Sequence, residues 1–177
     1  MSPIRVLAIA LVAAGVIVAN PICAQTPAPA NPLDAVPEKM PFDVPYGAPI
    51  TLERAEAVIA AAVAEAKRRD WKMNVAVVDS GGNLVAFQRM DGALLASIQI
   101  AQHKARAAAT FRRETKVFEN AVQLSDFKYV MTLDGMIASR GGIPLVEGGK
   151  IVGAIGCSGG AGSQDEVACK AGAATIK

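Results

Sequence analysis

Histidine and aromatic residues are scarce in this sequence, and neither sign of charge predominates. There is one histidine among 177 residues, and aromatic residues make up 5% of the chain. A single imidazole excludes the zinc sites that need several histidines, and no His-Glu-x-x-His or Cys-x-x-Cys motif is present. Because the formal net charge is only +2 and no basic run carries interleaved aromatics, we do not expect nucleic acid as a partner. No nucleophile elbow or Ser-His-Asp order accompanies the carboxylates, so no catalytic centre is self-evident.

The sequence also lacks an apolar run long enough to cross a bilayer. Residues 6–19 are uniformly apolar, but a transmembrane helix needs about 20 such residues. Arg5 precedes the run, and the run is broken before the small residue Ala24, which is the pattern of a secretory signal peptide. We therefore predict a cleaved signal peptide at residues 1–24, a periplasmic or secreted protein, and no membrane span in the mature chain.

Cysteine is rare as well, with three residues in the chain. Lipidation at Cys23 is an alternative to simple cleavage, but the bulky Ile22 stands where a small residue is normally required. Only Cys157 and Cys169 lie in the mature part, where an oxidising compartment allows a disulfide between them. The alternative is two small buried apolar side chains, and the sequence alone does not decide between these states.

Two segments follow the predicted signal peptide. Prolines recur throughout residues 25–49, so this segment is expected to be extended rather than helical or paired in a sheet. Phe42, Val44 and Tyr46 alternate with other residues near its end, and we expect this part to dock on the folded domain. Residues 50–177 are expected to form one domain, which is long enough to bury a core.

Hydrophobic periodicity predicts four helices in this domain. The first follows Thr51, a residue type that caps helix N-termini, and the last begins with a capping box that starts at Ser163. Residues 125–140 fit no regular pattern. The four helices are expected at residues 51–69, 93–110, 116–124 with Thr115 as the cap, and from Ser163 toward the C-terminus.

Two β-hairpins separate these helices. The β-rich segments at residues 73–78 and 84–87 flank a turn of the sequence Asp-Ser-Gly-Gly-Asn, and a similar acidic-Gly-Gly pattern occupies residues 145–153. Hairpins mixed with helices predict an α+β fold in which an antiparallel sheet of about four or five strands is flanked by helices.

The lone histidine lies on a polar face of the second predicted helix. Gln99, His103, Arg106 and Thr110 recur at helical spacing and therefore share this face. One interpretation is the wall of a pocket in which His103 is a haem-iron ligand or a proton carrier, since haem needs only one or two protein ligands. The other interpretation is an ordinary solvated helix face.

Other candidate ligand-binding residues lie outside that face. Met90 follows the first hairpin and is a candidate second iron ligand, or else core filler. Phe111 precedes Arg112 and Arg113, a pair that can clamp carboxylates by forked hydrogen bonds or form a charged corner. Gly160 belongs to a glycine-rich helix start whose N–H groups can hold an anion, although a tight strand-to-helix connection explains it equally well.

Five segments, taken in order, resemble the GlcG/HbpS family of haem-binding or haem-degrading domains. The resemblance spans about residues 50–177 and implies an antiparallel sheet with flanking helices, assembly into homo-oligomers, and a flat apolar ligand such as haem. It does not fix one ligand, and it assigns no residue to one. The segments are residues 73–92 (MNVAVVDSGGNLVAFQRMDG), 100–106 (IAQHKAR), 111–113 (FRR), 141–146 (GGIPLV) and 151–160 (IVGAIGCSGG).

The leading hypothesis is a periplasmic haem-binding protein that acts in haem storage, delivery or detoxification. His103 would ligate the iron, and Arg106, Arg112 and Arg113 would meet the propionates. A second hypothesis is an enzyme or binding protein for a small carboxylate or hydroxy acid, held at the glycine-rich helix start. A third is a non-catalytic oligomeric assembly module.

Overall fold

The computed structural model describes residues 31–177, and the predicted signal peptide lies outside this range. Contacts divide the chain into two units, Met1–Glu38 and Lys39–Lys177. In the first unit the described residues form a short 3-10 helix, η1 (Pro32–Asp34). No helix within residues 31–177 is long and apolar enough to cross a membrane.

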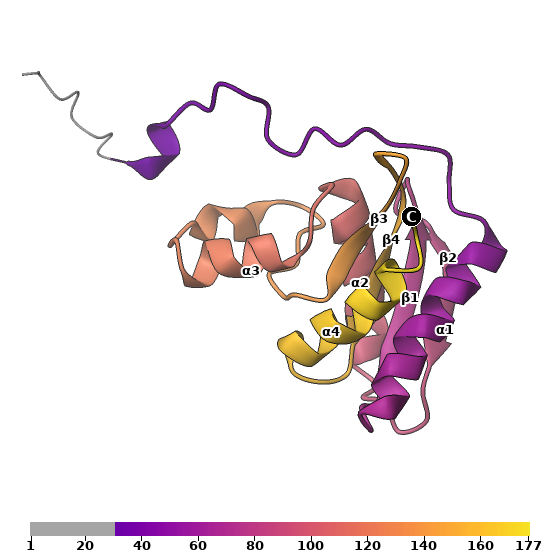
Figure 1. Ribbon diagram of the computed structural model, residues 1–177. Helices are drawn as coiled ribbons and strands as arrows, with labels where there is room; N and C mark the ends of the chain where they lie inside the picture. The colour runs from indigo at the N-terminus through magenta and orange to yellow at the C-terminus, as the bar shows by residue number, and fades with distance from the viewer. Residues whose placement is uncertain (1–30) are drawn as a thin grey trace, which may run out of the picture. The chain divides into compact units, whose positions relative to one another are not determined.

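The second unit has the expected α+β architecture, built on a four-stranded antiparallel sheet (Figure 1). Its strands follow the order β2-β1-β4-β3, so each predicted hairpin is present and the two hairpins meet through β1 and β4. Because β1 and β4 are central, they are the most buried strands. The strands are β1 (Asn74–Asp79), β2 (Leu84–Arg89), β3 (Gly142–Glu147) and β4 (Lys150–Ser158).

Helices cover both faces of this sheet. Side chains of β1 alternate between the faces, as the geometry of a strand requires. Val75 and Val77 pack with α1 (Leu52–Arg68) and α4 (Gly162–Ala173). Ala76 and Val78 pack instead with α2 (Ser97–Thr110). The domain core therefore consists of two apolar layers, one on each side of the sheet.

Helix α2 lies unusually close to the sheet because small residues face each other at the contact. Ala101 and Ala105 on the helix meet Gly156 on β4, where an added Cβ would collide with the Ala101 carbonyl oxygen. Gly142 on β3 is equally tight against the Lys104 carbonyl. This close seat fixes the position of α2, which carries several of the candidate site residues.

Residues 39–49, here called the strap, run onto the domain before α1. The strap meets β4 through a parallel bridge between Tyr46 and Ile151, with the N–H of Gly47 donating to the Ile151 carbonyl at 2.8 Å. The Tyr46 hydroxyl donates to the carbonyls of Ala109 and Thr110, at 3.1 and 3.0 Å. The predicted docking of this segment is therefore observed.

Helix starts are where the structure departs most from the sequence expectations. Thr51 caps α1 as predicted, accepting from the N–H of Arg54 at 3.4 Å. Thr115 occupies the N-cap position of α3, but its side chain makes no cap hydrogen bond, because its hydroxyl is buried and accepts the N–H of Gly142 at 2.9 Å. Ser163 does not cap α4 but lies inside it, and the N-cap residue is Ala161. Of the predicted reciprocal bonds only one is possible, because alanine has no side-chain acceptor: the Ala161 N–H donates to the Gln164 side-chain oxygen at 2.8 Å.

The remaining elements lie between α2 and β3. Helix α3 (Lys116–Gln123) matches its predicted position, whereas α2 begins at Ser97, after a turn that occupies the first residues of the predicted helix. The stretch that fitted no pattern holds a 3-10 helix, η2 (Lys128–Thr132), which packs against α3. Together α3 and η2 form a small lobe beside the C-terminal end of α2 (Figure 1).

Candidate functional site

A hollow lies between this small lobe, the end of α2 and the strap. It has a volume of about 570 Å³, and its walls are mainly aromatic and aliphatic side chains. We call it the aromatic hollow. It is lined by Phe42, Phe111, Arg113, Val117, Phe118, Asn120, Ala121, Ser125, Phe127, Tyr129, Val130 and Leu133.

The chain turn after α2 builds one end of the hollow. Arg112 has a positive φ of 55°, which reverses the chain directly after the helix. The reversal brings Phe111 against Phe118 of α3, with ring centroids 5.0 Å apart and planes at 74°, an edge-to-face arrangement that aromatic rings favour. Arg113 then follows on the same side and lies among the aromatic rings.

Arg113 is the one charged side chain that lines the aromatic hollow. Its Cζ lies 3.3 Å from the ring centroid of Phe42 and 5.4 Å from that of Phe118, and its Nε donates to the Phe111 carbonyl at 2.9 Å. Burial lowers the pKa of this guanidinium, against a raising effect of nearby Tyr129. No carboxylate within residues 31–177 pairs with it. A partly desolvated cation without a counter-charge favours an anionic ligand group.

The wall formed by α3 is held in place by ion pairs. Glu119 of α3 accepts both the Nε and the backbone N–H of Arg140, each at 2.7 Å. Arg140 also reaches Glu166 of α4 at 3.4 Å, and Lys116 at the start of α3 meets Glu166 at 3.1 Å. These bonds tie the small lobe to the domain core near the N-terminus of α4.

His103 lines a different hollow, of about 250 Å³, together with Gln99, Gln102 and Arg106. Its Nε2 lies 3.2 Å from the Gly135 carbonyl oxygen. A carbonyl only accepts, so this ring nitrogen carries the proton and the lone pair of the neutral imidazole is on Nδ1. The structure therefore places the imidazole at a polar surface depression rather than on the aromatic hollow.

Three other predicted site residues have structural partners on or near α2. Arg106 donates from Nε to the Gly82 carbonyl at 3.3 Å and so holds the turn between β1 and β2. The Thr110 hydroxyl donates to the Arg106 carbonyl at 2.9 Å. Arg112 lies over the Tyr46 ring at 4.9 Å and donates to the Val44 carbonyl at 3.4 Å, which fastens the strap.

Met90 and Gly160 are not brought to either hollow. The Met90 sulfur accepts the Met73 N–H at 3.4 Å, and the side chain packs on the core layer shared with α1. The Gly160 N–H donates to the Asp165 carboxylate at 3.1 Å, so the glycine-rich helix start uses this donor internally. Of the eight predicted site residues, Phe111 and Arg113 line the aromatic hollow, and His103 and Arg106 share the depression on α2. A further depression of about 250 Å³ beside the strap brings together Thr110, Phe111, Arg112 and Arg113.

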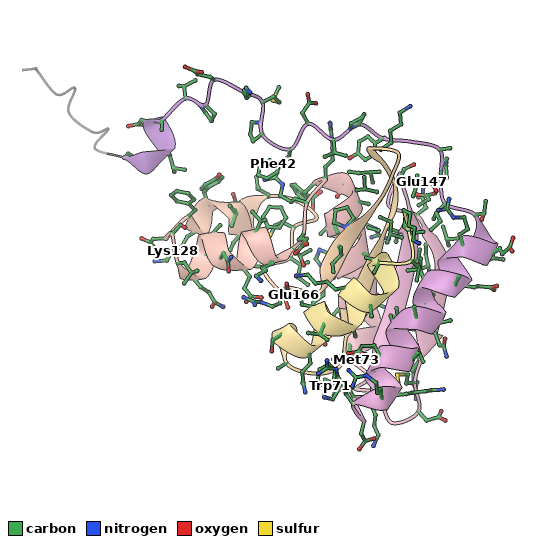
Figure 2. All side chains as sticks on the ribbon, in the orientation of Figure 1. Phe42, Trp71, Met73, Lys128, Glu147 and Glu166 are labelled. Carbon is green, nitrogen blue, oxygen red and sulfur yellow. A yellow bond between two sulfur atoms is a disulfide. The ribbon has the colours of Figure 1, made fainter. Side chains whose placement is uncertain are left out.

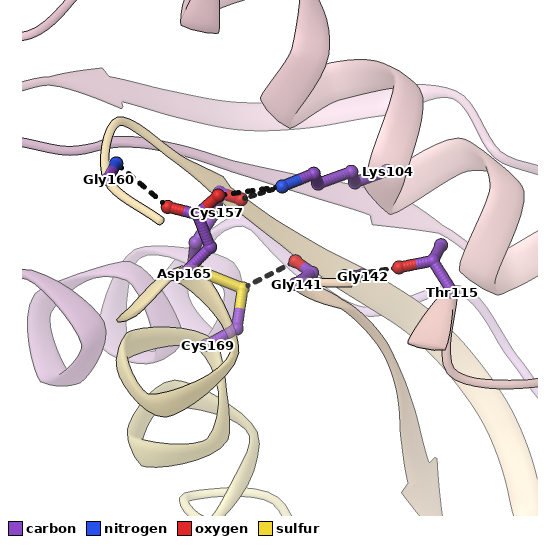
Figure 3. The surroundings of a disulfide bond; sticks show 8 residues. All are labelled: Lys104, Thr115, Gly141, Gly142, Cys157, Gly160, Asp165 and Cys169. Carbon is purple, nitrogen blue, oxygen red and sulfur yellow. Dashed lines mark hydrogen bonds and ion pairs between the residues drawn. A yellow bond between two sulfur atoms is a disulfide. The ribbon is translucent and has the colours of Figure 1, made fainter. Parts of the chain in front are cut away.

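The sequence reasoning missed a buried ion pair behind these surfaces. Lys104 Nζ lies 2.7 Å from the Asp165 carboxylate, and the two side chains are 1% and 3% exposed. Lys104 also donates to the Cys157 carbonyl at 3.3 Å (Figure 3). Burial raises the pKa of Asp165, and the Lys104 ammonium opposes this effect. One signal was present in the sequence: Lys104 shares the apolar face of α2 with Ala101, Ala105 and Ala108.

A disulfide joins Cys157 at the end of β4 to Cys169 in α4, with Cα atoms 5.6 Å apart (Figure 3). Of the two states that the sequence left open, the structure therefore has the disulfide and not two free buried thiols. Both cysteines are fully buried, next to the Lys104–Asp165 pair. The bridge and the ion pair together anchor α4 to the sheet and to α2.

Several lining residues of the aromatic hollow were also missed. Tyr129 and Phe127 come from the stretch that fitted no periodic pattern, and Phe42 comes from the strap (Figure 2). The available signal in the sequence was the concentration of aromatic residues within residues 111–129 of a chain that is only 5% aromatic.

Comparisons with known proteins agree on one family. Residues 50–174 match the family model described as "Haem degrading protein HbpS-like". The chain is 41% identical to Protein GlcG of Escherichia coli over 109 residues, which cover 62% of this chain and 81% of that protein.

Solved structures are similar as well. A double mutant of HbpS from Streptomyces reticuli superposes with a TM-score of 0.66 at 30% identity, covering 81% of this chain and 97% of that one. A structure described as a PduOC:heme complex superposes with a TM-score of 0.65 at 26% identity, covering 73% of this chain and 96% of that one.

Proposed function

We propose a haem-binding function for this chain. The chain belongs to the HbpS-like family, and the proposal starts from that membership. The observation that carries the proposal is Arg113, an unpaired and partly desolvated cation among the rings of the aromatic hollow. Such a site favours a ligand with a flat apolar body and a carboxylate at its edge. Haem has both features, and a heme complex is among the similar structures.

The residues of the aromatic hollow fit haem by size and by chemistry. Small-molecule pockets of about 300–1,000 Å³ are typical, and the volume of about 570 Å³ lies within this range. The rings of Phe111 and Phe127 would contact the porphyrin, and Arg113 would hold a propionate. When bound, haem would supply a redox-active iron, whereas these residues hold the macrocycle and exclude water from its faces.

Two side chains are candidates for the iron ligand. His103 follows from the sequence, but it lines the separate depression near Gly135. Tyr129 lines the aromatic hollow itself, and tyrosine is one of the side chains that ligate haem iron. We propose that Tyr129 is the better placed of the two for a haem in the aromatic hollow.

We propose further that the protein works outside the cytoplasm in haem storage, delivery or detoxification, as a homo-oligomer. The Cys157–Cys169 disulfide supports this location, because such bonds persist mainly in oxidising compartments. The predicted signal peptide at residues 1–24 points the same way. Mass spectrometry of the exported protein tests it, with Gln25 as the expected first residue.

Haemin titration of the mature protein, followed at the Soret band, tests the haem proposal. Arg113→Gln should weaken binding about 10- to 100-fold, since a hydrogen bond to a charged group contributes about 1.5–3 kcal/mol. The matched control is Arg89→Gln, because that arginine is exposed on β2, away from both the aromatic hollow and the strap. Equal effects of the two substitutions, or no haemin binding by the wild-type protein, would contradict the proposal.

The iron ligand is tested in the same titration. Tyr129→Phe should shift the Soret band of the complex while leaving affinity for iron-free protoporphyrin unchanged, since it removes only the phenol oxygen. His103→Ala should leave the band in place. The reverse pattern would return the ligand role to His103 and place the haem at the depression on α2.

A further inference from the structure

The strap contributes to the aromatic hollow although it precedes the family domain. The family match begins at residue 50, whereas Phe42 of the strap is one of the residues lining the hollow. The strap is fixed to the domain by the Tyr46 hydroxyl, the bridge to Ile151 and the contacts of Arg112. Phe42 is thus held over the hollow by contacts on its C-terminal side.

Phe42 has a backbone conformation that its residue type rarely adopts. Its φ is 61°, in a turn where Pro41 comes immediately before it. A proline followed by a positive-φ position is the arrangement of type II turns, and glycine is favoured at the second of these positions. A bulky residue there is an outlier, so the strap places an aromatic ring where the backbone alone favours glycine.

The ring that this turn presents has its centroid 3.3 Å from the Arg113 Cζ, and Phe42 as a residue remains 41% exposed. A guanidinium stacks through its face and donates hydrogen bonds through its edge. Phe42, labelled in Figure 2, therefore covers one face of Arg113 without competing for a carboxylate, and it also lines the hollow.

We propose that Phe42 is a ligand-contacting residue, so that the strap is a wall of the binding site added to the family domain. The proposal rests on the proposed function in naming a flat aromatic carboxylate as the ligand class. Ligand binding would bury the exposed part of the ring and orient the Arg113 edge toward the carboxylate.

Phe42→Gly separates this role from a purely structural one. Glycine suits the positive φ, which offsets the lost stacking on Arg113, so the turn is retained and the variant should melt close to the wild-type temperature. Loss of the ring removes apolar contact and stacking, and affinity should fall roughly tenfold. Leu95→Ala is the matched control, because Leu95 is a large apolar side chain that is 65% exposed but lines neither the aromatic hollow nor the depression beside the strap.

Two probes are titrated into each full-length mature variant: haemin, and the aromatic anion 8-anilinonaphthalene-1-sulfonate. A loss of affinity for either probe in Phe42→Gly but not in Leu95→Ala supports the proposal. Binding of the sulfonate with this pattern, without any binding of haemin, would overturn the haem function and leave the wall intact. Wild-type affinity of Phe42→Gly for both probes would refute the proposed ligand contact of Phe42 but would not contradict the haem function. Binding of neither probe by the wild-type protein would overturn both.

Discussion

Replacing Lys104 by methionine tests the buried ion pair most directly. Methionine keeps the length and apolar stem of the side chain but removes the ammonium that lies 2.7 Å from Asp165. The carboxylate would remain buried, with hydrogen bonds from the backbone near Gly160 as its remaining partners. Its desolvation would then be offset only in part.

The expected loss is about 3–5 kcal/mol of unfolding free energy, which is the usual cost of removing one partner of a buried pair. This is a large part of the roughly 5–15 kcal/mol that stabilises a typical domain. Lys116→Met is the matched control, since Lys116 also pairs with an α4 carboxylate, Glu166, but its side chain is 38% exposed. Exposed pairs contribute about 0–1 kcal/mol, so the control should lose no more than that.

Guanidinium unfolding of the disulfide-bonded protein at several pH values is the assay. Burial already raises the pKa of Asp165 above 3.8, and loss of the ammonium should raise it further. A carboxyl whose pKa is raised in the folded state costs no stability at a pH below its ordinary pKa, because it is then protonated in both states. The destabilisation grows as the pH rises above that ordinary pKa and is complete once the pH has passed through the raised folded-state pKa. The deficit of Lys104→Met should therefore be small near pH 4 and full at pH 8.

A second substitution controls for the cavity that the first creates. Asp165→Asn added to Lys104→Met removes the buried charge but keeps an oxygen for the Gly160 N–H, and it should restore at least half of the lost stability. A deficit under about 1 kcal/mol, or one that does not change with pH, would refute the electrostatic reasoning.

Three further outcomes follow from contacts elsewhere in the domain. Cys169→Ala should lose about 3 kcal/mol of unfolding free energy, because the bridge closes a loop with a sequence separation of 12; an unchanged denaturation midpoint would contradict this. Gly156→Ala should cost about 3 kcal/mol or more by thermal melting, because its Cβ would collide with the Ala101 carbonyl; wild-type melting would show that α2 yields at this contact. The pKa of Glu65 is lowered to about 2 by hydrogen bonds from Arg68 and Arg69, so its NMR titration should have a midpoint near 2 instead of 4.5. These pairs should stabilise fully above pH 4.5 and be lost as the pH falls through about 2, whereas Arg69→Ala should move the midpoint upward.

Local patterns in the sequence were sufficient for most of the fold. The first hairpin was predictable because Asp79 forms its own turn, accepting the N–H groups of Gly81 and Asn83 at 2.8 and 2.9 Å. Helix α1 was predictable because its cap, Thr51, directly precedes the helix and its apolar stripe lies within it. Thr115 failed as a cap for the opposite reason, since its partner Gly142 is distant in sequence.

The candidate site depends on contacts of this distant kind. The aromatic hollow combines Phe42, Phe111 and Tyr129, which come from three separate segments, and no periodicity links them. Lys104 was hidden for a related reason, because its partner Asp165 is on a helix packed against the other face of the sheet. Helical spacing grouped His103 with Arg106 correctly, but it gave no information on which depression a ligand would enter.

The tight seat of α2 on Gly142 and Gly156 has a consequence for how the hollow can adapt. A helix whose backbone touches the sheet cannot tilt or slide without steric overlap, so the edge that Phe111 forms is rigid. The opposing walls are the turn of the strap that contains Phe42 and the small lobe of α3 and η2, which is held by partly exposed ion pairs. When ligands of different thickness bind, the strap and the small lobe should therefore move, whereas the wall formed by α2 should stay in place.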